Sequence, residues 1–132
     1  KKVFFSANWF SSKIKSSIPI DFLLSNGIKY AYRNSNLVIK IFNEANLTAF
    51  VFENKSPYIP KDKQEKIFAR YISYAHAHQE FGIGLGLYAS KKIVEAHNGV
   101  IFVESFKDDR NIFGFKIPYD EQYKDLERKV TF

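Results

Sequence analysis

Residues 82–99 read GIGLGLYASKKIVEAHNG, and this stretch decides how the rest of the sequence is interpreted. Gly82, Gly84 and Gly86 alternate with apolar residues, and the residues that follow predict a helix to His97. Glycines let backbone N–H groups approach a phosphate, and the helix N-terminus behind them favours negative charge. The stretch therefore predicts a phosphate-binding turn, with a purely structural loop before a helix as the alternative.

The turn differs from two well-known glycine-rich phosphate loops. No Gly-Lys-Ser/Thr follows it, as a Walker loop requires, and its spacing is not the dinucleotide-binding Gly-x-Gly-x-x-Gly. Leu85 and Leu87 are expected to point inward and anchor the turn. Asn98-Gly99 is expected to end the helix as a left-handed cap.

A second helix is expected over residues 19–33, with Asn26, Lys29, Tyr30 and Arg33 on one face by helical spacing. An amide oxygen can ligate Mg²⁺ beside phosphate oxygens, and a lysine one turn on can pair with the same phosphates. The alternative is an ordinary amphipathic helix with a polar outer face. The opposite face is expected to be core, made of Leu24, Gly27, Ile28 and Ala31.

The remaining chain predicts paired strands and one short helix. Expected strands are 37–42 and 47–52, which form a hairpin, then 100–106, 112–118 and a short edge strand at 1–6; residues 62–71 are expected to be helical. Residues 119–132 are expected to form a terminal helix or a tail. Because the strands come as hairpins, the order predicts an α/β fold with a mixed, mainly antiparallel sheet and helices on one face.

Length and composition are typical of one soluble globular domain. The chain has 132 residues and a net charge of +6, and its first 48 residues hold seven Lys/Arg against two Asp/Glu. That basic half suggests nucleic acid, lipid or phosphate as a partner, or simply a solvated surface. The absence of cysteine excludes disulfides and cysteine-ligated metals. Since the sequence begins with Lys1 and lacks methionine, we expect it to be a piece of a longer protein.

Four blocks in fixed order resemble the catalytic ATP-binding domain of two-component sensor histidine kinases of bacteria. Residues 25–30 are similar to its asparagine box, 54–60 to its first glycine box, 66–71 to its phenylalanine box and 82–99 to its second glycine box. The resemblance covers about residues 18–118, and its superfamily includes type II topoisomerases and mismatch-repair ATPases. It implies a two-layer α/β sandwich of the Bergerat type, with residues 1–118 as the domain and 119–132 as a tail.

The resemblance also implies residue roles. Asn26 would ligate Mg²⁺, Lys29 would reach the phosphates, Tyr30 would flank the nucleotide and Arg70 would neutralise the γ-phosphate. Asn26, Lys29 and Arg70 are thereby implied as the catalytic set. Residues 71–81 would form a lid. The implied nucleotide-binding residues are Asn26, Lys29, Tyr30, Asn54, Ile59, Gly82, Ile83, Gly84, Leu85, Gly86 and Leu87.

Four positions depart from the family pattern. Asn54 stands where relatives carry an aspartate that accepts a hydrogen bond from the adenine amino group. An asparagine can still accept, but without the charge that strengthens such a bond. Ser56 and Tyr58 replace glycines, and Phe22 stands where many relatives have a polar residue.

The function implied is the binding of Mg-ATP and donation of its γ-phosphate to a histidine on upstream dimerisation helices. A response regulator is the implied protein partner, and no nucleic acid or membrane contact is expected of the domain, which alone is expected to be monomeric. The parent is expected to be anchored in the inner membrane with this domain in the cytoplasm. His76, His78 and His97 are not expected to be phosphate acceptors. The alternatives are a degenerate nucleotide-sensing module and a serine kinase of the anti-sigma type.

Overall fold

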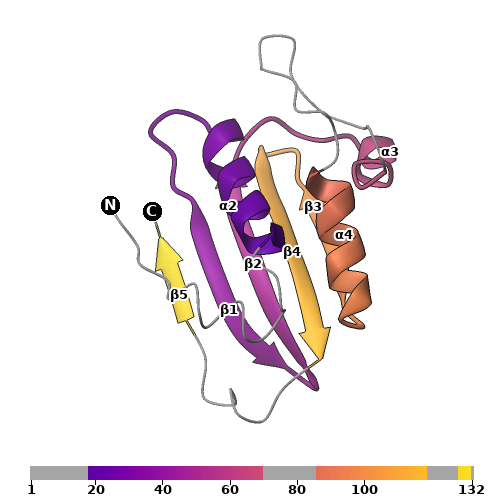
Figure 1. Ribbon diagram of the computed structural model, residues 1–132. Coiled ribbons are helices and arrows are strands. Elements are labelled where there is room, and N and C mark those ends of the chain that lie inside the picture. Colours follow the sequence, from indigo (N-terminus) through magenta and orange to yellow (C-terminus); the bar gives the residue numbers. More distant parts are fainter. Residues whose placement is uncertain (1–17, 70–85, 119–127, 132) are drawn as a thin grey trace.

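The computed structural model describes residues 18–69, 86–118 and 128–131 (Figure 1). Its helices are α2 (Ile18–Tyr30), α3 (Lys61–Gln64) and α4 (Gly86–Ala96), and its strands are β1 (Val38–Glu44), β2 (Leu47–Lys55), β3 (Val100–Ser105), β4 (Arg110–Pro118) and β5 (Arg128–Thr131). None of the helices in these ranges has the length and apolar character needed to cross a membrane. The expected strand at 1–6 and the expected lid lie outside the described residues.

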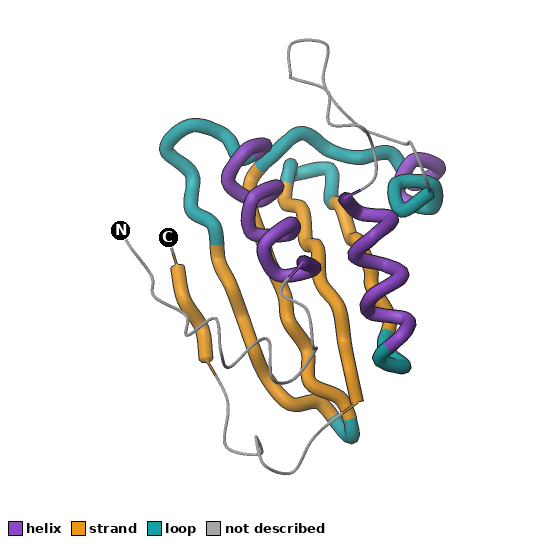
Figure 2. Tube along the Cα trace, in the orientation of Figure 1, coloured by secondary structure: helices purple, strands orange, loops and turns teal. Residues whose placement is uncertain are grey.

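The strands form one five-stranded sheet in the order β3-β4-β2-β1-β5. In the described part of the chain, all four pairs of neighbouring strands are antiparallel. This agrees with the prediction of a mainly antiparallel sheet. Helices α2 and α4 lie side by side against the same face of the sheet (Figures 1 and 2). The predicted α/β class, a two-layer sandwich with helices on one face, is confirmed.

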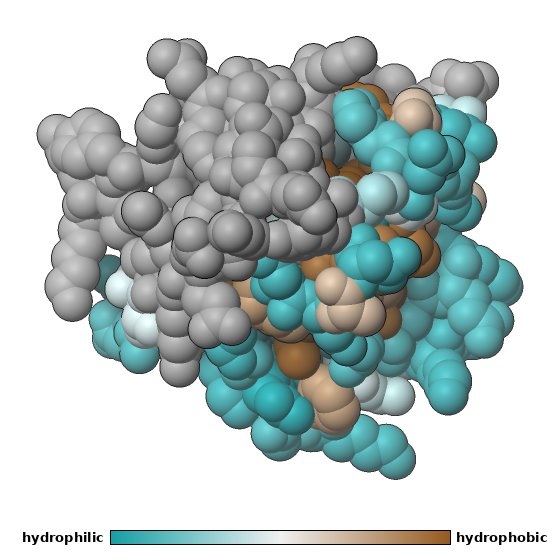
Figure 3. Space-filling model, turned by 90° about the horizontal axis from the view of Figure 1, so that it is seen from below, coloured by the Kyte–Doolittle hydropathy of each residue, from teal (hydrophilic) through white to brown (hydrophobic). Residues whose placement is uncertain are grey.

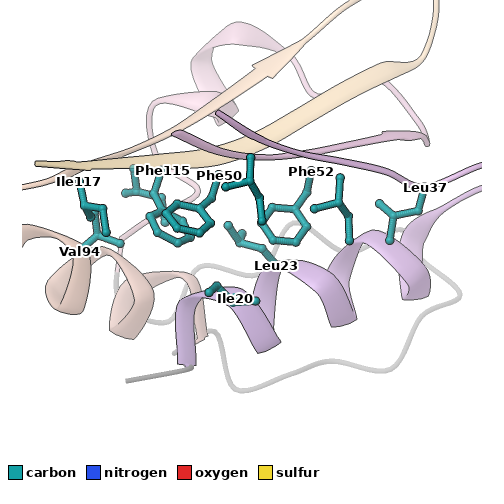
Figure 4. Packing of buried hydrophobic residues seen from close by; sticks show 11 residues of the cluster. Ile20, Leu23, Leu37, Phe50, Phe52, Val94, Phe115 and Ile117 are labelled. Atoms are coloured by element: carbon teal, nitrogen blue, oxygen red, sulfur yellow. The ribbon is translucent and has the colours of Figure 1, made fainter. Parts of the chain in front are cut away.

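The hydrophobic core fills the space between the sheet and the two helices (Figure 4). Phe50 of β2 and Phe115 of β4 are opposite each other in the register, and their rings stack with centroids 4.7 Å apart. Leu23 of α2 and Val94 of α4 close the core from the helix side. Burial of each such side chain stabilises the fold by roughly 1.5–3 kcal/mol. Seen from below, the described surface is mostly hydrophilic, with some hydrophobic residues showing between (Figure 3).

Helix α4 ends where the sequence predicted. Asn98 has the left-handed φ of 57°. The N–H of Gly99 donates to Val94 O at 2.9 Å, and that of Asn98 donates to Glu95 O at 2.9 Å. This pair of bonds is the Schellman arrangement. His97 Nδ1 lies 2.7 Å from Ile93 O, so the side chain of this histidine forms a hydrogen bond with a carbonyl of the last helical turn.

Helix α2 ends at Tyr30, three residues before the expected end. The backbone leaves the helix because the N–H of Tyr32 donates to Lys55 O at the end of β2, at 2.7 Å, instead of to a carbonyl one turn back. Asn34 then has a φ of 64°. A tertiary contact therefore sets this end.

The buried face of α2 is also rotated relative to the prediction. Ile28, expected in the core, is 64% exposed, whereas Leu23, left out of the expected core face, is 1% exposed. Gly27 is buried as expected, and a Cβ there would lie 2.8 Å from Leu37 Cδ1. Leu24 packs only at the margin of the core. The apolar residues of this helix span a wide arc, and the sheet contacts the Leu23 side of it.

Two other segments differ from the sequence prediction. The helix expected at 62–71 is the single turn α3, followed by a turn in which Ile67 is buried. Residues 128–131, expected to be helix or tail, form β5, with Val38 opposite Thr131 in the β1 pairing. The hairpin of β1 and β2 is confirmed, with Ala45 in the left-handed region of its turn.

Candidate functional site

The polar face of α2 carries three of the predicted site residues. Asn26 and Tyr30 are half-buried and one helical turn apart, while Lys29 is exposed. Lys29 Nζ lies 5.4 Å from the centre of the Tyr30 ring, a cation–π distance. Arg33, the fourth member of the predicted stripe, is exposed and lies beyond the helix.

The beginning of α4 meets α2 through a glycine. A Cβ placed on Gly86 would lie 1.7 Å from Cε2 of Phe22, so the aromatic ring occupies the space that any side chain would need. Phe22 precedes Asn26 by one turn and shares its side of α2. Gly86 is the last glycine of the predicted phosphate turn, and it therefore lies beside the asparagine face.

The other residues of the turn divide into described and undescribed ones. Leu87 packs against the core, as predicted for an anchor of the turn. Gly82, Ile83, Gly84 and Leu85 lie outside the described residues, and so does Arg70. Their predicted roles stay predictions.

Asn54, at the end of β2, lies beneath α2. Its side chain is 6% exposed. Nδ2 donates to Gly27 O at 3.0 Å, and Oδ1 accepts from Ser56 Oγ at 3.0 Å. Gly27 is in the last turn of α2, where carbonyl groups have no helical partner, so Asn54 satisfies one of them. Both ends of the predicted base-recognition side chain are thus bonded within the protein.

Asn54 is one end of a polar relay, defined here as Asn54, Ser56, Asn111 and Ser105. Asn111 Nδ2 donates to Ser56 Oγ at 2.5 Å, and Asn111 Oδ1 accepts from Ser105 Oγ. Ser105 Oγ in turn accepts from the N–H of Ile59 at 2.8 Å. Buried Ile59 is thereby fixed through its backbone.

The sequence analysis missed Asn111, although a signal was present. Alternate residues 111, 113, 115 and 117 of β4 share one face, on which Phe113, Phe115 and Ile117 belong to or pack on the core. An asparagine in such an apolar row predicts a satisfied buried amide. Asn111 is 1% exposed, and its amide nitrogen also donates to Pro57 O at 3.0 Å.

A tight turn between β3 and β4 fastens the neighbouring loop. Asp109 Oδ2 accepts from Tyr32 Oη at 2.8 Å, and its Oδ1 accepts from the N–H of Tyr58 at 3.1 Å. The backbone N–H of Ser56 donates to Asp109 O at 3.0 Å. The hydrogen bond to the Asp109 carboxylate, more than burial or charge, raises the pKa of Tyr32 above 10.0.

An open hollow of about 400 Å³ lies on a different part of α2. It is lined by Asp21, Leu24, Ser25, Ile28 and Lys29. Of the predicted site residues its lining includes Lys29 alone, so the hollow does not coincide with the predicted nucleotide site.

Comparison with known proteins identifies the family. The model of the histidine kinase-, DNA gyrase B-, and HSP90-like ATPases matches residues 20–121. The chain belongs to this ATPase family. The adaptive-response sensory kinase SasA of Microcystis aeruginosa is 33% identical over 97 residues, covering 73% of this chain and 25% of SasA. The chain spans about a quarter of the length of the first curated relatives that it matches.

Solved structures of histidine kinases are also similar to this chain. The nucleotide-free catalytic domain of the histidine kinase ThkA is 28% identical with a TM-score of 0.64, covering 76% of this chain and 63% of that one. ThkA in complex with the response regulator protein TrrA is 26% identical with a TM-score of 0.62, covering 79% and 28%. These relatives place the chain with the catalytic ATP-binding domains of sensor histidine kinases.

Proposed function

We propose that this chain binds Mg-ATP between α2 and the start of α4 and donates the γ-phosphate to a histidine on a dimerisation domain of the same protein. The observation that carries the proposal is the contact of Phe22 with Gly86, which brings the Asn26 face of α2 close to the last glycine of the predicted turn. Membership of the ATPase family and the histidine kinase relatives support it.

The described residues suit a magnesium triphosphate. Asn26 would offer its amide oxygen to Mg²⁺, which accepts few protein ligands and takes the rest from phosphate and water. Lys29 would pair with the phosphates, and Tyr30 would flank the nucleotide. The N-terminus of α4 at Gly86 would present backbone N–H groups to phosphate oxygens. Bound ATP supplies the phosphoryl group.

The remaining proposed site residues include Arg70 and residues 82–85, which lie outside the described residues. Arg70 would neutralise charge on the γ-phosphate, and residues 82–85 would shape the turn around it. Asn54 and Ile59 belong to the proposed base end of the site.

In the transfer, a nitrogen of the acceptor imidazole bonds to phosphorus as the bond to the β-phosphate oxygen breaks, ADP leaves and the ring releases its N–H proton. The chain's part is to position and to stabilise charge.

Calorimetry with a non-hydrolysable ATP analogue and Mg²⁺ tests the binding step. We expect weak binding by the chain, loss of at least tenfold in affinity for Asn26→Ala, and no change for Asn36→Ala, an exposed asparagine in the loop after α2. Binding that is equal in both variants would contradict the proposed role of Asn26. The transfer step is tested on the parent protein, where the phosphoryl group should appear on a histidine outside this domain and on none of His76, His78 and His97.

A nucleotide-sensing module without transferase activity is the second candidate. It is motivated by two departures from the family pattern, Asn54 and Phe22. The amide of Asn54 is bonded to Gly27 and Ser56 within the protein, and an aromatic ring at position 22 lies against Gly86. The two candidates differ in one result: a sensor binds the ATP analogue, but its parent transfers no phosphate. The named relatives are sensor kinases, which gives no support to a serine kinase of the anti-sigma type.

Partners and location follow from the same proposal. The parent would phosphorylate a response regulator, as suggested by the complex of ThkA with TrrA. The domain would lie in the cytoplasm, with the parent in the inner membrane. Mixing the phosphorylated parent with candidate regulators and following the label identifies the partner.

A further inference from the structure

The polar relay has a fixed direction, because its two ends allow only one arrangement of hydrogen bonds. Gly27 O can only accept, so the atom of Asn54 that faces it must be Nδ2. Asn54 Oδ1 must then accept, and Ser56 Oγ must donate to it. At the other end, the N–H of Ile59 can only donate, to Ser105 Oγ.

The middle of the relay follows from these ends. With its hydrogen directed at Asn54, Ser56 Oγ can only accept from Asn111 Nδ2. Asn111 Oδ1 is left to accept from Ser105 Oγ, whose own lone pair accepts from Ile59. Asn54, Ser56 and Asn111 are all at least 94% buried, so water offers little replacement for any lost link.

This direction limits what Asn54 can offer to a base. One of the two N–H groups of Nδ2 donates to α2, and one of the two lone pairs of Oδ1 accepts from Ser56. One N–H and one neutral lone pair remain, on a residue that is 6% exposed. An aspartate here would offer a charged acceptor, but it would also face the Gly27 carbonyl with oxygen against oxygen.

We propose that Asn54 serves to close the C-terminal end of α2, and that this chain therefore selects its nucleotide by the triphosphate and hardly by the base. The proposal rests on the proposed function, since it concerns the same site. The remaining lone pair can accept from an amino group, and the remaining N–H can donate to a purine oxygen. A purine with an oxygen in place of the adenine amino group therefore exchanges at most one neutral hydrogen bond for another, which changes affinity by no more than about tenfold.

The test is binding of non-hydrolysable analogues of ATP and GTP, each with Mg²⁺, to the whole 132-residue chain by calorimetry or displacement. The proposal expects dissociation constants within about tenfold of each other, and a preference for the ATP analogue beyond tenfold overturns it. If neither analogue binds at millimolar concentration, the proposed function fails, and the variants below still test the closing role of Asn54.

The matched variants are Asn54→Asp and Asn46→Asp, the second at an exposed position of the hairpin turn. Asn54→Asp should lower the midpoint of thermal unfolding by several degrees without tightening binding of the ATP analogue, while Asn46→Asp should leave both unchanged. A stable Asn54→Asp variant that binds the ATP analogue more tightly and excludes the GTP analogue would overturn the proposal.

Discussion

Helices α2 and α4 lie side by side on one face of the sheet, yet their C-terminal ends are closed in different ways. Helix α4 closes itself with bonds from Asn98 and Gly99 to its own last turn. Helix α2 is closed from outside, since Asn54 of β2 donates to Gly27 O and Lys55 O accepts from Tyr32. The comparison shows that a local end is readable from sequence and a tertiary end is not.

The largest effect is expected when the close packing at the end of α4 is broken. A Cβ on Gly99 would lie 2.4 Å from Lys116 O, a backbone atom that cannot swing away. Gly99→Ala should therefore lower the free energy of unfolding by about 3 kcal/mol, measured by urea denaturation. A loss below about 1 kcal/mol would show that β4 yields at this point.

The next effect concerns the external closure of α2. Asn54→Leu keeps the volume but leaves Gly27 O and the Ser56 hydroxyl without their partner, and it should cost about 2 kcal/mol. Hydrogen exchange should quicken in residues 27–30 and stay unchanged in α4. Equal acceleration in both helices would mean that Asn54 supports the fold in general, and Asn36→Leu, at an exposed position, is the control.

A smaller effect is expected at Asn98, the left-handed residue that follows α4. Asn98 has a φ of 57°, which glycine tolerates better than alanine. Asn98→Ala should lower the free energy of unfolding by about 1 kcal/mol, whereas Asn98→Gly should not lower it. Identical unfolding midpoints for the two variants would argue against a strained cap.

The smallest effect is a titration at the exit of α2. The bond from Tyr32 Oη to Asp109 raises the pKa of Tyr32 above its ordinary value of 10.0. Because this folded-state pKa is raised, the bond contributes to stability fully below pH 10 and is lost as the pH rises through the pKa of Tyr32. An NMR titration should show the pKa returning toward 10.0 in Asp109→Asn. An unchanged titration would place the cause elsewhere.

Much of the fold was predictable because its signals are local. The alternation of strands, the hairpin turn and the Asn98-Gly99 cap each depend on neighbours in the sequence. The buried face of α2 was not predictable, because Leu23 and Ile28 are both strongly apolar. Which of them is buried depends on the side of the helix that packs against the sheet. β5 was missed because its four residues gain strand structure by pairing with β1.

The candidate site was predictable in part for the same reason. Asn26 and Gly86 stand in recognisable motifs, and the structure brings their segments together through Phe22. The hydrogen bonds of the Asn54 side chain to Gly27 and Ser56 were not predicted. The bond to Gly27 forms only because α2 approaches β2 in the fold. Asn111 was readable in principle, as a polar residue in an apolar row.

An NMR titration of the labelled chain with a non-hydrolysable ATP analogue and Mg²⁺ tests most directly whether α2 and the start of α4 form one binding site. Amide signals of residues 26–30 and of Gly86 and Leu87 should shift together, along a single saturation curve, while those of β5 stay in place. Shifts confined to one of the two helices, or to neither, would contradict the account.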